Sequence, residues 1–283
     1  MPFNHLKKIL YFLKKFLLIK FLSEIIEPEQ IILKKLKFKT VIDIGSHLGF
    51  FTKSFLSNSK KVISIDPLSY LINFQKIIFY FNKNIKFLNY AIGLKDEKKN
   101  IFIPYGQNFY NDSRSSLVIK EKKSKKVKIK VKNGDKLLKQ YDVDFIKIDA
   151  EGYELQIIKS LKSLIHKKKP TLLIEIIPNS LMDIAYQEIL NEKNNNNLEI
   201  FRYLNKHGYE IFYCDKIDKL KKISLKNIKK KFREKTYNFK FKKNSKDIKK
   251  YKILRNKKYI IMFFFIPKFL KHNSQIELKK ITR

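Results

Sequence analysis

The sequence predicts a doubly wound α/β fold with a mostly parallel, seven-stranded sheet. Apolar runs of strand length alternate with helical stretches from Thr40 onward, which is typical of a parallel sheet covered by helices. Buried parallel strands have nearly continuous apolar sequences. Seven such runs occur, at 41–44, 61–67, 85–89, 143–149, 171–176, 209–214 and 259–266. The connections between neighbouring parallel strands are expected to be right-handed.

The first predicted strand leads into a turn that contains two glycines, Gly45 and Gly49. Glycine allows a backbone conformation that is strained for other residues and allows a ligand to approach closely. The helix predicted over 47–57 offers free N–H groups at its start, and Asp43 near the strand end could hold a cation. The spacing is not the G-x-G-x-x-G of dinucleotide-binding folds, and no P-loop lysine follows Gly49.

The remaining elements follow in order. A second helix is predicted over 68–82, with an apolar face formed by Leu71, Phe74, Ile78 and Phe81. Residues 94–132 interrupt the alternation with two short strands, 101–104 and 127–131. The polar loop between them, around 111–116, is long enough to cover a ligand or admit a substrate. The next helix is expected to end near His166, and the four asparagines at 194–197 are expected to link two helical segments.

The sequence divides into an extension and one domain. Residues 1–37 are expected to form a basic amphipathic helical extension, which could lie on an anionic membrane or pack on the domain. Residues 38–283 form the domain, with a lysine-rich, exposed insertion at about 215–258. No uncharged run approaches the roughly 20 residues of a membrane span. No small-residue cleavage site follows the apolar positions, so a signal peptide is not expected.

The chain is strongly basic. It has 63 lysines and arginines against 26 acidic residues, a formal charge of +37. Such a charge suits an anionic partner such as nucleic acid or a membrane surface. The charge equally fits a drift of the amino-acid composition that serves no partner. The even spread of the lysines along the chain favours this second explanation. The single cysteine, Cys214, cannot form an internal disulfide and fits a reducing cytoplasm. The basic extension is compatible with a position at the inner face of the membrane.

Acidic residues stand at the ends of four predicted strands: Asp43, Asp66, Asp149 and Glu175. Ligands of open α/β sheets bind along that edge. Carboxylates that converge there need cations, hydrogen-bond donors or water. Asp66, 23 residues after Asp43, is placed to accept hydrogen bonds from both hydroxyls of a ribose. Asn89 and Ala91 follow the third strand, where an adenine ring could rest.

A series of motifs runs from about Thr40 to Ile177: V-I-D-I-G-S-H-L-G-F-F-T, S-I-D-P, N-Y-A-I-G, S-S-L, D-F-I-K-I-D-A-E-G-Y-E and L-L-I-E-I. In order and spacing it resembles the FkbM family of S-adenosylmethionine (SAM)-dependent methyltransferases, which have a class I methyltransferase-like fold. The closing Y-I-I-M-F-F-F-I-P-K also resembles the last strand of that family. Asp66 stands where the family usually has Glu, and Ala150 where it usually has Val. Residues 1–37 and 215–258 lie outside the resemblance.

The resemblance implies SAM-dependent transfer of a methyl group to a hydroxyl of a sugar, glycan or related metabolite. The cofactor-binding residues would be Asp43, Gly45, His47, Gly49, Asp66, Asn89 and Ala91. Asp149, Glu151 and Glu175 would be catalytic, with Asp149 the first candidate for the general base that an alcohol acceptor needs. His47 is a further candidate base. The three carboxylates could in principle bind a divalent ion, but no spacing demands it, and no metal is expected.

Two other functions are compatible with parts of the sequence. The positive charge would suit an RNA-binding methyltransferase, although Asp149-Ala150-Glu151-Gly152 is not the N/D-P-P-Y/F tetrad of many enzymes that methylate nucleic-acid amino groups. The amphipathic extension would suit a non-catalytic membrane-associated protein. No residue pattern indicates an oligomeric state.

Overall fold

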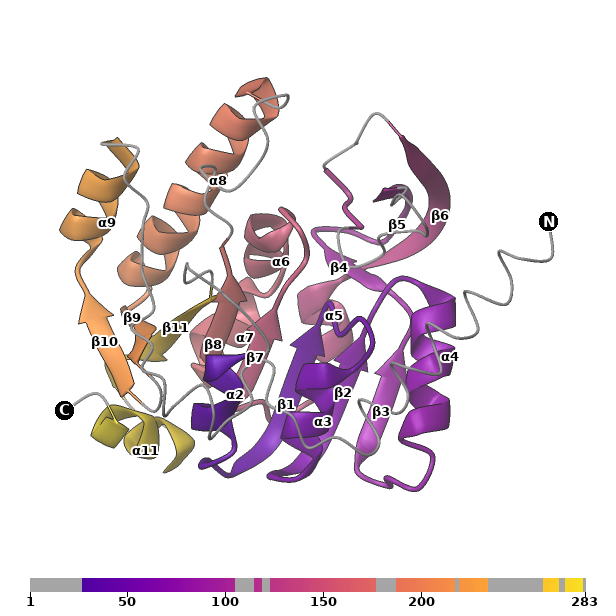
Figure 1. The fold of residues 1–283 in the computed structure, drawn as a ribbon, viewed down its shortest axis with the longest axis horizontal. Coiled ribbons are helices and arrows are strands. Elements are labelled where there is room, and N and C mark those ends of the chain that lie inside the picture. The colour runs from indigo at the N-terminus through magenta and orange to yellow at the C-terminus, as the bar shows by residue number, and fades with distance from the viewer. Residues whose placement is uncertain are drawn as a thin grey trace.

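The structure is a computed structural model, and it describes residues 27–104, 115–118, 123–176, 187–216, 219–233, 262–269 and 273–281. Its centre is an eight-stranded sheet in the order β10-β9-β11-β8-β7-β1-β2-β3 (Figure 1). The strands are β1 (Phe38–Ile44), β2 (Ser59–Ile65), β3 (Ile85–Leu88), β7 (Phe145–Ile148), β8 (Thr171–Glu175), β9 (Tyr209–Lys216), β10 (Lys219–Ile223) and β11 (Met262–Pro267).

The sheet is mostly parallel, as the sequence predicts. β3, β2, β1, β7 and β8 pair in parallel, while β11 is antiparallel to both β8 and β9. The strand order reverses between β1 and β7, which is where open α/β sheets bind their ligands. The eighth strand, β10, is an addition to the predicted seven and forms a hairpin with β9.

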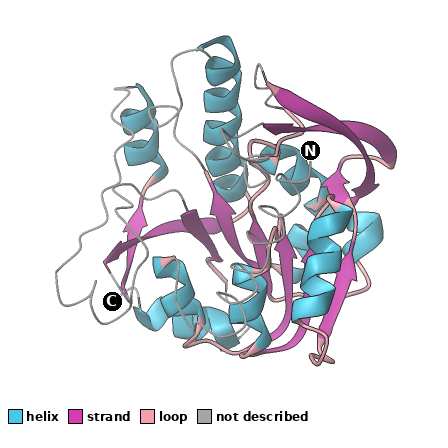
Figure 2. Ribbon diagram, turned by 45° about the vertical axis from the view of Figure 1, so that its right-hand side comes forward, coloured by secondary structure: helices cyan, strands magenta, loops and turns pink. Residues whose placement is uncertain are grey.

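Helices flank the strands (Figure 2). They are α2 (Pro28–Leu33), α3 (Phe50–Leu56), α4 (Ser69–Ile78), α5 (Gly134–Leu138), α6 (Glu154–Ser160), α7 (Lys162–Lys168), α8 (Gln187–Lys206), α9 (Leu225–Arg233) and α11 (Asn273–Ile281). Within the described ranges, no helix has both the length and the apolar character needed to cross a membrane.

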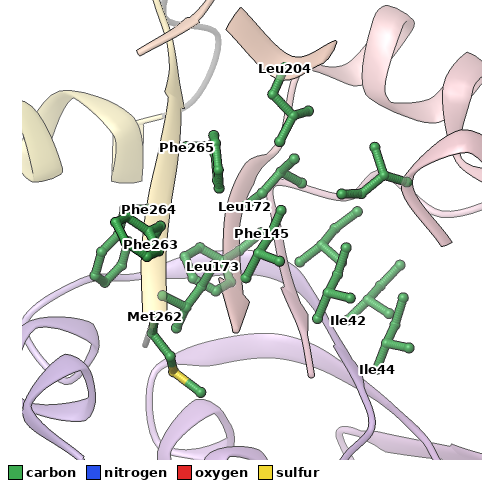
Figure 3. Packing of buried hydrophobic residues seen from close by; sticks show 14 of the residues in the cluster. Ile42, Ile44, Phe145, Leu172, Leu173, Leu204, Met262, Phe263, Phe264 and Phe265 are labelled. Atoms are coloured by element: carbon green, nitrogen blue, oxygen red, sulfur yellow. The ribbon is translucent and has the colours of Figure 1, made fainter. Parts of the chain in front are cut away.

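The core lies along the central strands (Figure 3). Every residue of β11 is buried, which confirms the predicted final strand over the described part of 259–266. Phe201 of α8 packs edge-to-face on Phe263, with ring centroids 5.1 Å apart, and also contacts Phe265. These aromatic contacts attach α8 to the antiparallel part of the sheet.

A second, three-stranded sheet has the order β4-β6-β5. It consists of β4 (Ala91–Gly93), β5 (Glu97–Pro104) and β6 (Ser124–Asn133), and β5 and β6 form a long antiparallel pair at the upper right of Figure 1. The two short strands predicted here are confirmed and are longer than expected. Of the predicted polar loop at 111–116, only Ser115 and Ser116 belong to the described residues, and Ser116 pairs with Phe102.

Several predicted boundaries were wrong. The asparagines at 194–197 do not form a linker but lie inside the continuous helix α8, because downstream apolar residues such as Leu204 hold that helix in the core.

The helix predicted over 68–82 ends at Ile78, so Phe81 lies beyond it and is exposed. The helix predicted from 47 begins only at Phe50, because Gly49 has a positive φ of 87°. The helix expected to end near His166 is divided into α6 and α7 at Leu161.

The predicted lysine-rich insertion is partly integrated into the fold. Residues 219–233 form β10 and α9, and their apolar side chains Leu220, Ile223 and Ile228 are buried. The rest of the range from 217 to 258 lies outside the described residues, as do residues 1–26 of the predicted extension. The described end of that extension contains α2, whose six residues are all buried.

Candidate functional site

A cavity of about 400 Å³ opens at the carboxyl ends of β1, β2, β7 and β8. Its volume lies within the range of about 300–1,000 Å³ that is usual for small-molecule sites. The apolar part of its lining includes Ala91, Ile92, Ile101 and Leu117, of which the first three belong to the smaller sheet. The acidic part consists of Glu27, Asp66, Asp149, Glu151 and Glu175. The cavity therefore offers an apolar wall and a group of carboxylates to one ligand.

Gly45, the residue after β1, lies close to the backbone of Asp149, the residue after β7. Its φ is 72°, and a Cβ atom built there would lie 1.7 Å from the backbone oxygen of Asp149. Its N–H donates to the carbonyl of Ile65, 3.0 Å away. Only glycine fits this position, and the backbone that passes through it lines the cavity.

Gln75 of α4 holds the turn that follows Gly45. Its Nε2 donates to the Ser46 hydroxyl and to the His47 carbonyl, both at 2.8 Å, and its Oε1 accepts from the Ser64 hydroxyl at 2.7 Å. The side chain is fully buried. This satisfied polar network fixes a turn in which His47 itself has a positive φ of 49°. Gln75 was not among the predicted site residues, although a glutamine in line with Leu71 and Ile78 on a buried helix face is a signal of such a network.

Asp66 is held rigidly at the end of β2 and lines the cavity. One carboxylate oxygen accepts from the His47 N–H at 3.0 Å, and the other accepts from the Leu68 N–H at 2.9 Å. Burial raises the pKa of Asp66 to about 6, although these two backbone hydrogen bonds act in the opposite direction. Because a carboxylate has about four acceptor positions, Asp66 retains room for two further donors.

Lys147 places a buried positive charge beneath the cavity. Its side chain is 3% exposed, and its ammonium lies 3.0 Å from Asp149, 3.5 Å from Asp43 and 3.0 Å from the Gly45 carbonyl. Burial opposes the charged form, but the carboxylates of Asp149 and then Asp43 outweigh it, so the pKa of Lys147 is raised. This lysine was not among the predicted site residues, although a lysine inside a buried apolar strand is itself a signal.

Three carboxylates converge beside this lysine. Oxygen atoms of Asp149, Glu151 and Glu175 all lie within 4.8 Å of one another. Oxygen ligands of this kind suit a divalent cation. They equally suit a substrate with hydroxyl or ammonium groups, and one of the three is already paired with Lys147. Of the four strand-end acids predicted to converge at this edge, Asp149 and Glu175 do so here, and Glu151 joins them.

A family comparison agrees with this geometry. Residues 43–211, more than half of the chain, match the model of the methyltransferase FkbM domain. The chain belongs to the FkbM methyltransferase family. The sequence has no significant match among the curated proteins compared.

Solved structures similar to this FkbM chain are distant. The FkbM methyltransferase of Methylobacillus flagellatus KT has 16% identity and a TM-score of 0.42, and the match covers 65% of this chain but only 46% of that one. SMU.1697c, a putative methyltransferase of Streptococcus mutans in complex with SAH, has 10% identity and a TM-score of 0.39, covering 67% and 89% of the two chains. The SAH-bound PaMTH1 of Podospora anserina has 10% identity and a TM-score of 0.38, covering 62% and 66%.

The site residues predicted for this FkbM chain fall into two groups. Gly45, His47, Asp66, Ala91, Asp149, Glu151 and Glu175 line the cavity. Asp43, Gly49 and Asn89 are not among the lining residues.

Asp43 is buried behind Gly45, where its carboxylate accepts a hydrogen bond from the Thr52 hydroxyl at 2.7 Å, and burial raises the pKa of Asp43. Asn89 donates to the Asp66 carbonyl at 2.9 Å, and Gly49 packs against the Phe79 ring, so these residues support the cavity from outside.

Glu154, in the same motif, caps the chain where it enters α6. Its Oε1 accepts from the N–H groups of Ala150 and Gly152, at 3.1 and 2.9 Å. The backbone there is unusual, because Glu151 and Gly152 both have positive φ. Glu154 therefore stabilises the turn that carries Glu151.

Proposed function

We propose that this FkbM-family chain is a SAM-dependent methyltransferase that methylates a hydroxyl group of a sugar, glycan or related metabolite. The observation that carries the proposal is the environment of Asp66. Its carboxylate lines the cavity, is oriented by two backbone N–H groups and lies next to the glycine turn after β1. That arrangement suits a ligand with two neighbouring hydroxyls, as in the ribose of SAM.

The other lining residues fit the rest of such a cofactor. The apolar wall of Ala91, Ile92 and Ile101 suits an aromatic base. The carboxylate of Asp149 suits the positively charged end of the molecule, since opposite charges attract most strongly where water is scarce. When bound, SAM supplies a methyl group on a positively charged sulfur. The protein has to hold the acceptor in line with that group, and positioning of this kind accounts for much of an enzyme's rate.

The acceptor hydroxyl also has to lose a proton. Asp149, Glu151 and Glu175 lie close enough together for one acceptor group to reach any of them, and we assign the general base to this trio. Lys147 fixes Asp149 in place through its ion pair. The acidic lining favours an acceptor that donates hydrogen bonds, such as a polyol, over a phosphate-rich nucleic acid.

Calorimetric titration with S-adenosylhomocysteine (SAH), the demethylated product, tests the cofactor assignment. We expect one molecule to bind per chain, and we expect Asp66→Ala to weaken binding at least about tenfold. Affinity should also fall as the pH drops through about 6, because a protonated Asp66 accepts fewer hydrogen bonds. Asp66→Glu should retain binding, since the family usually has Glu there.

Asp142→Ala is the matched control, because Asp142 is an acid on the exposed surface whose side chain is 58% exposed. It should leave the affinity and its pH dependence unchanged. If the wild-type protein fails to bind SAH, or if a folded Asp66→Ala variant binds it as tightly as the wild type, the proposal is wrong.

A further inference from the structure

Three large apolar side chains stand exposed at the carboxyl end of α4 and just beyond it. Ile77 is 66% exposed, Tyr80 79% and Phe81 82%. They lie within five consecutive residues, whereas the other exposed large apolar side chains of the described chain are scattered. We call these three residues the α4 patch. The opposite face of α4 is buried through Leu71, Ile72 and Ile78, so the patch does not serve the core.

The α4 patch is flanked by positive charge. Lys76, next to Ile77, and Lys83, two residues after Phe81, are both exposed. The sequence contains no acidic residue between Asp66 and Asp96, a stretch that includes four lysines. Exposed aromatic and aliphatic side chains bordered by lysines are suited to the interface of an anionic membrane, where the apolar groups insert and the ammonium groups meet lipid headgroups.

The shape of the patch favours lipid over single-stranded RNA. RNA-binding surfaces present aromatic faces on which successive bases stack. Here the rings of Tyr80 and Phe81 meet edge-to-face, with centroids 5.3 Å apart and planes at 83°, so the pair presents no flat platform. The third member, Ile77, is aliphatic and gains from burial in hydrocarbon but not from stacking.

The patch also lies away from the cavity. Leu68 and Leu71, at the start of α4, line the cavity, and Ile77 follows Leu71 by six residues. At 1.5 Å per residue this places Ile77 about 9 Å further along the helix axis, at the opposite end of α4. A surface that meets the patch would therefore leave the cavity accessible.

We propose that the α4 patch docks the protein on an anionic lipid bilayer. The ligand is the lipid surface itself, recognised by partial insertion of Ile77, Tyr80 and Phe81 and by the neighbouring lysines. This inference does not depend on the methyltransferase assignment, because it rests on a surface outside the cavity.

Co-sedimentation of the full chain with vesicles tests the proposal. The wild type should sediment with vesicles that contain phosphatidylserine and much less with phosphatidylcholine alone. The triple variant Ile77→Ser/Tyr80→Ser/Phe81→Ser should lose affinity for the anionic vesicles at least about tenfold, since three apolar side chains no longer insert. Phe269→Ser is the matched control, because Phe269 is 87% exposed but lies after β11, and it should bind like the wild type.

Each other outcome overturns the proposal. If the wild type does not bind, or if the triple variant binds as well as the wild type, the patch is not the docking surface. If the triple variant turns a dimer into a monomer in sedimentation without vesicles, the patch binds a second copy of the chain. If it loses affinity for single-stranded RNA and not for lipid, the partner is RNA. An unchanged melting temperature of the triple variant checks that these readings concern a folded protein.

Discussion

The buried Lys147 of β7 forms ion pairs with Asp43 of β1 and with Asp149, the residue that follows β7. Removing one partner of a buried ion pair leaves uncompensated charge and costs about 3–5 kcal/mol. We therefore expect Lys147→Met to lower the free energy of unfolding by that amount in urea titrations. Lys159→Met is the matched control, because Lys159 pairs with Glu199 at 2.7 Å on the surface, where such pairs contribute about 0–1 kcal/mol.

A double-mutant cycle separates the charge from the packing of the lysine stem. In an Asp149→Asn background, Lys147→Met leaves only one buried carboxylate without its partner, so its cost should be smaller than in the wild type. An equal cost in both backgrounds would mean that Lys147 stabilises the protein by packing alone.

Gly45 and Gly208 both have positive φ but differ in their surroundings. At Gly45 a Cβ atom would lie 1.7 Å from a carbonyl oxygen, whereas at Gly208 it would meet nothing within 4 Å. Gly208→Ala should therefore cost only the backbone strain, about 1–2 kcal/mol. Gly45→Ala adds a clash with rigid backbone and should cost more than about 3 kcal/mol. Thermal unfolding of the two variants measures the difference, and equal losses would contradict the close approach of Gly45 to the Asp149 backbone.

At the level of single residues, the side chains that line the cavity were easier to predict than the side chains that hold those lining residues in position. Asp66, Asp149 and Glu175 are recognisable because acids are scarce and stand at strand ends, where topology brings them together. Gln75 and Lys147 were missed because their roles depend on contacts between elements far apart in the sequence. Asp43 was predicted to lie at the cavity, but it does not line it, because its buried carboxylate is held by the Thr52 hydroxyl and the Lys147 ammonium.

Among the elements, α8 shows how tertiary packing overrides local sequence. Four consecutive asparagines suggest a break, yet the helix continues through them because Phe201 and Leu204 are buried further along. We expect Phe201→Ala to lower the free energy of unfolding by about 3–5 kcal/mol, since it removes contacts with Phe263 and Phe265. Arg202→Ala, at the neighbouring exposed position, should change it by less than about 0.5 kcal/mol. Similar small losses in both variants would mean that α8 does not cover the sheet.

The strands were easier to predict than the helix ends. Seven apolar runs correspond to strands of the main sheet, because a strand buried on both faces has little choice of composition. β10 was not predicted. Three of its five residues are lysines and only Leu220 and Ile223 are apolar, so the segment resembles an exposed stretch unless its pairing with β9 is known. The helix boundaries were wrong where one backbone conformation decides them, as at Gly49 and Leu161.

For the whole molecule, the excess of positive charge has a consequence for stability. If every one of the 26 acidic residues paired with a basic one, a formal charge of +37 would still remain. Their mutual repulsion favours the expanded chain and is screened by salt, whose Debye length falls from about 30 Å at 0.01 M to about 10 Å at 0.1 M. The surface ion pairs that salt weakens contribute only about 0–1 kcal/mol each.

We therefore expect the melting temperature to rise between low and moderate ionic strength, by at least about 2–4 °C, which corresponds to about 1 kcal/mol for a chain of this size. NaCl and KCl at equal ionic strength should have the same effect, because screening depends on charge and concentration and not on the identity of the monovalent cation. A melting temperature that stays constant or falls over this range would mean that ion pairs outweigh the net repulsion. The measurement belongs with the Asp66 and α4-patch experiments, since it defines the salt concentration at which the protein is stable enough for its binding properties to be compared.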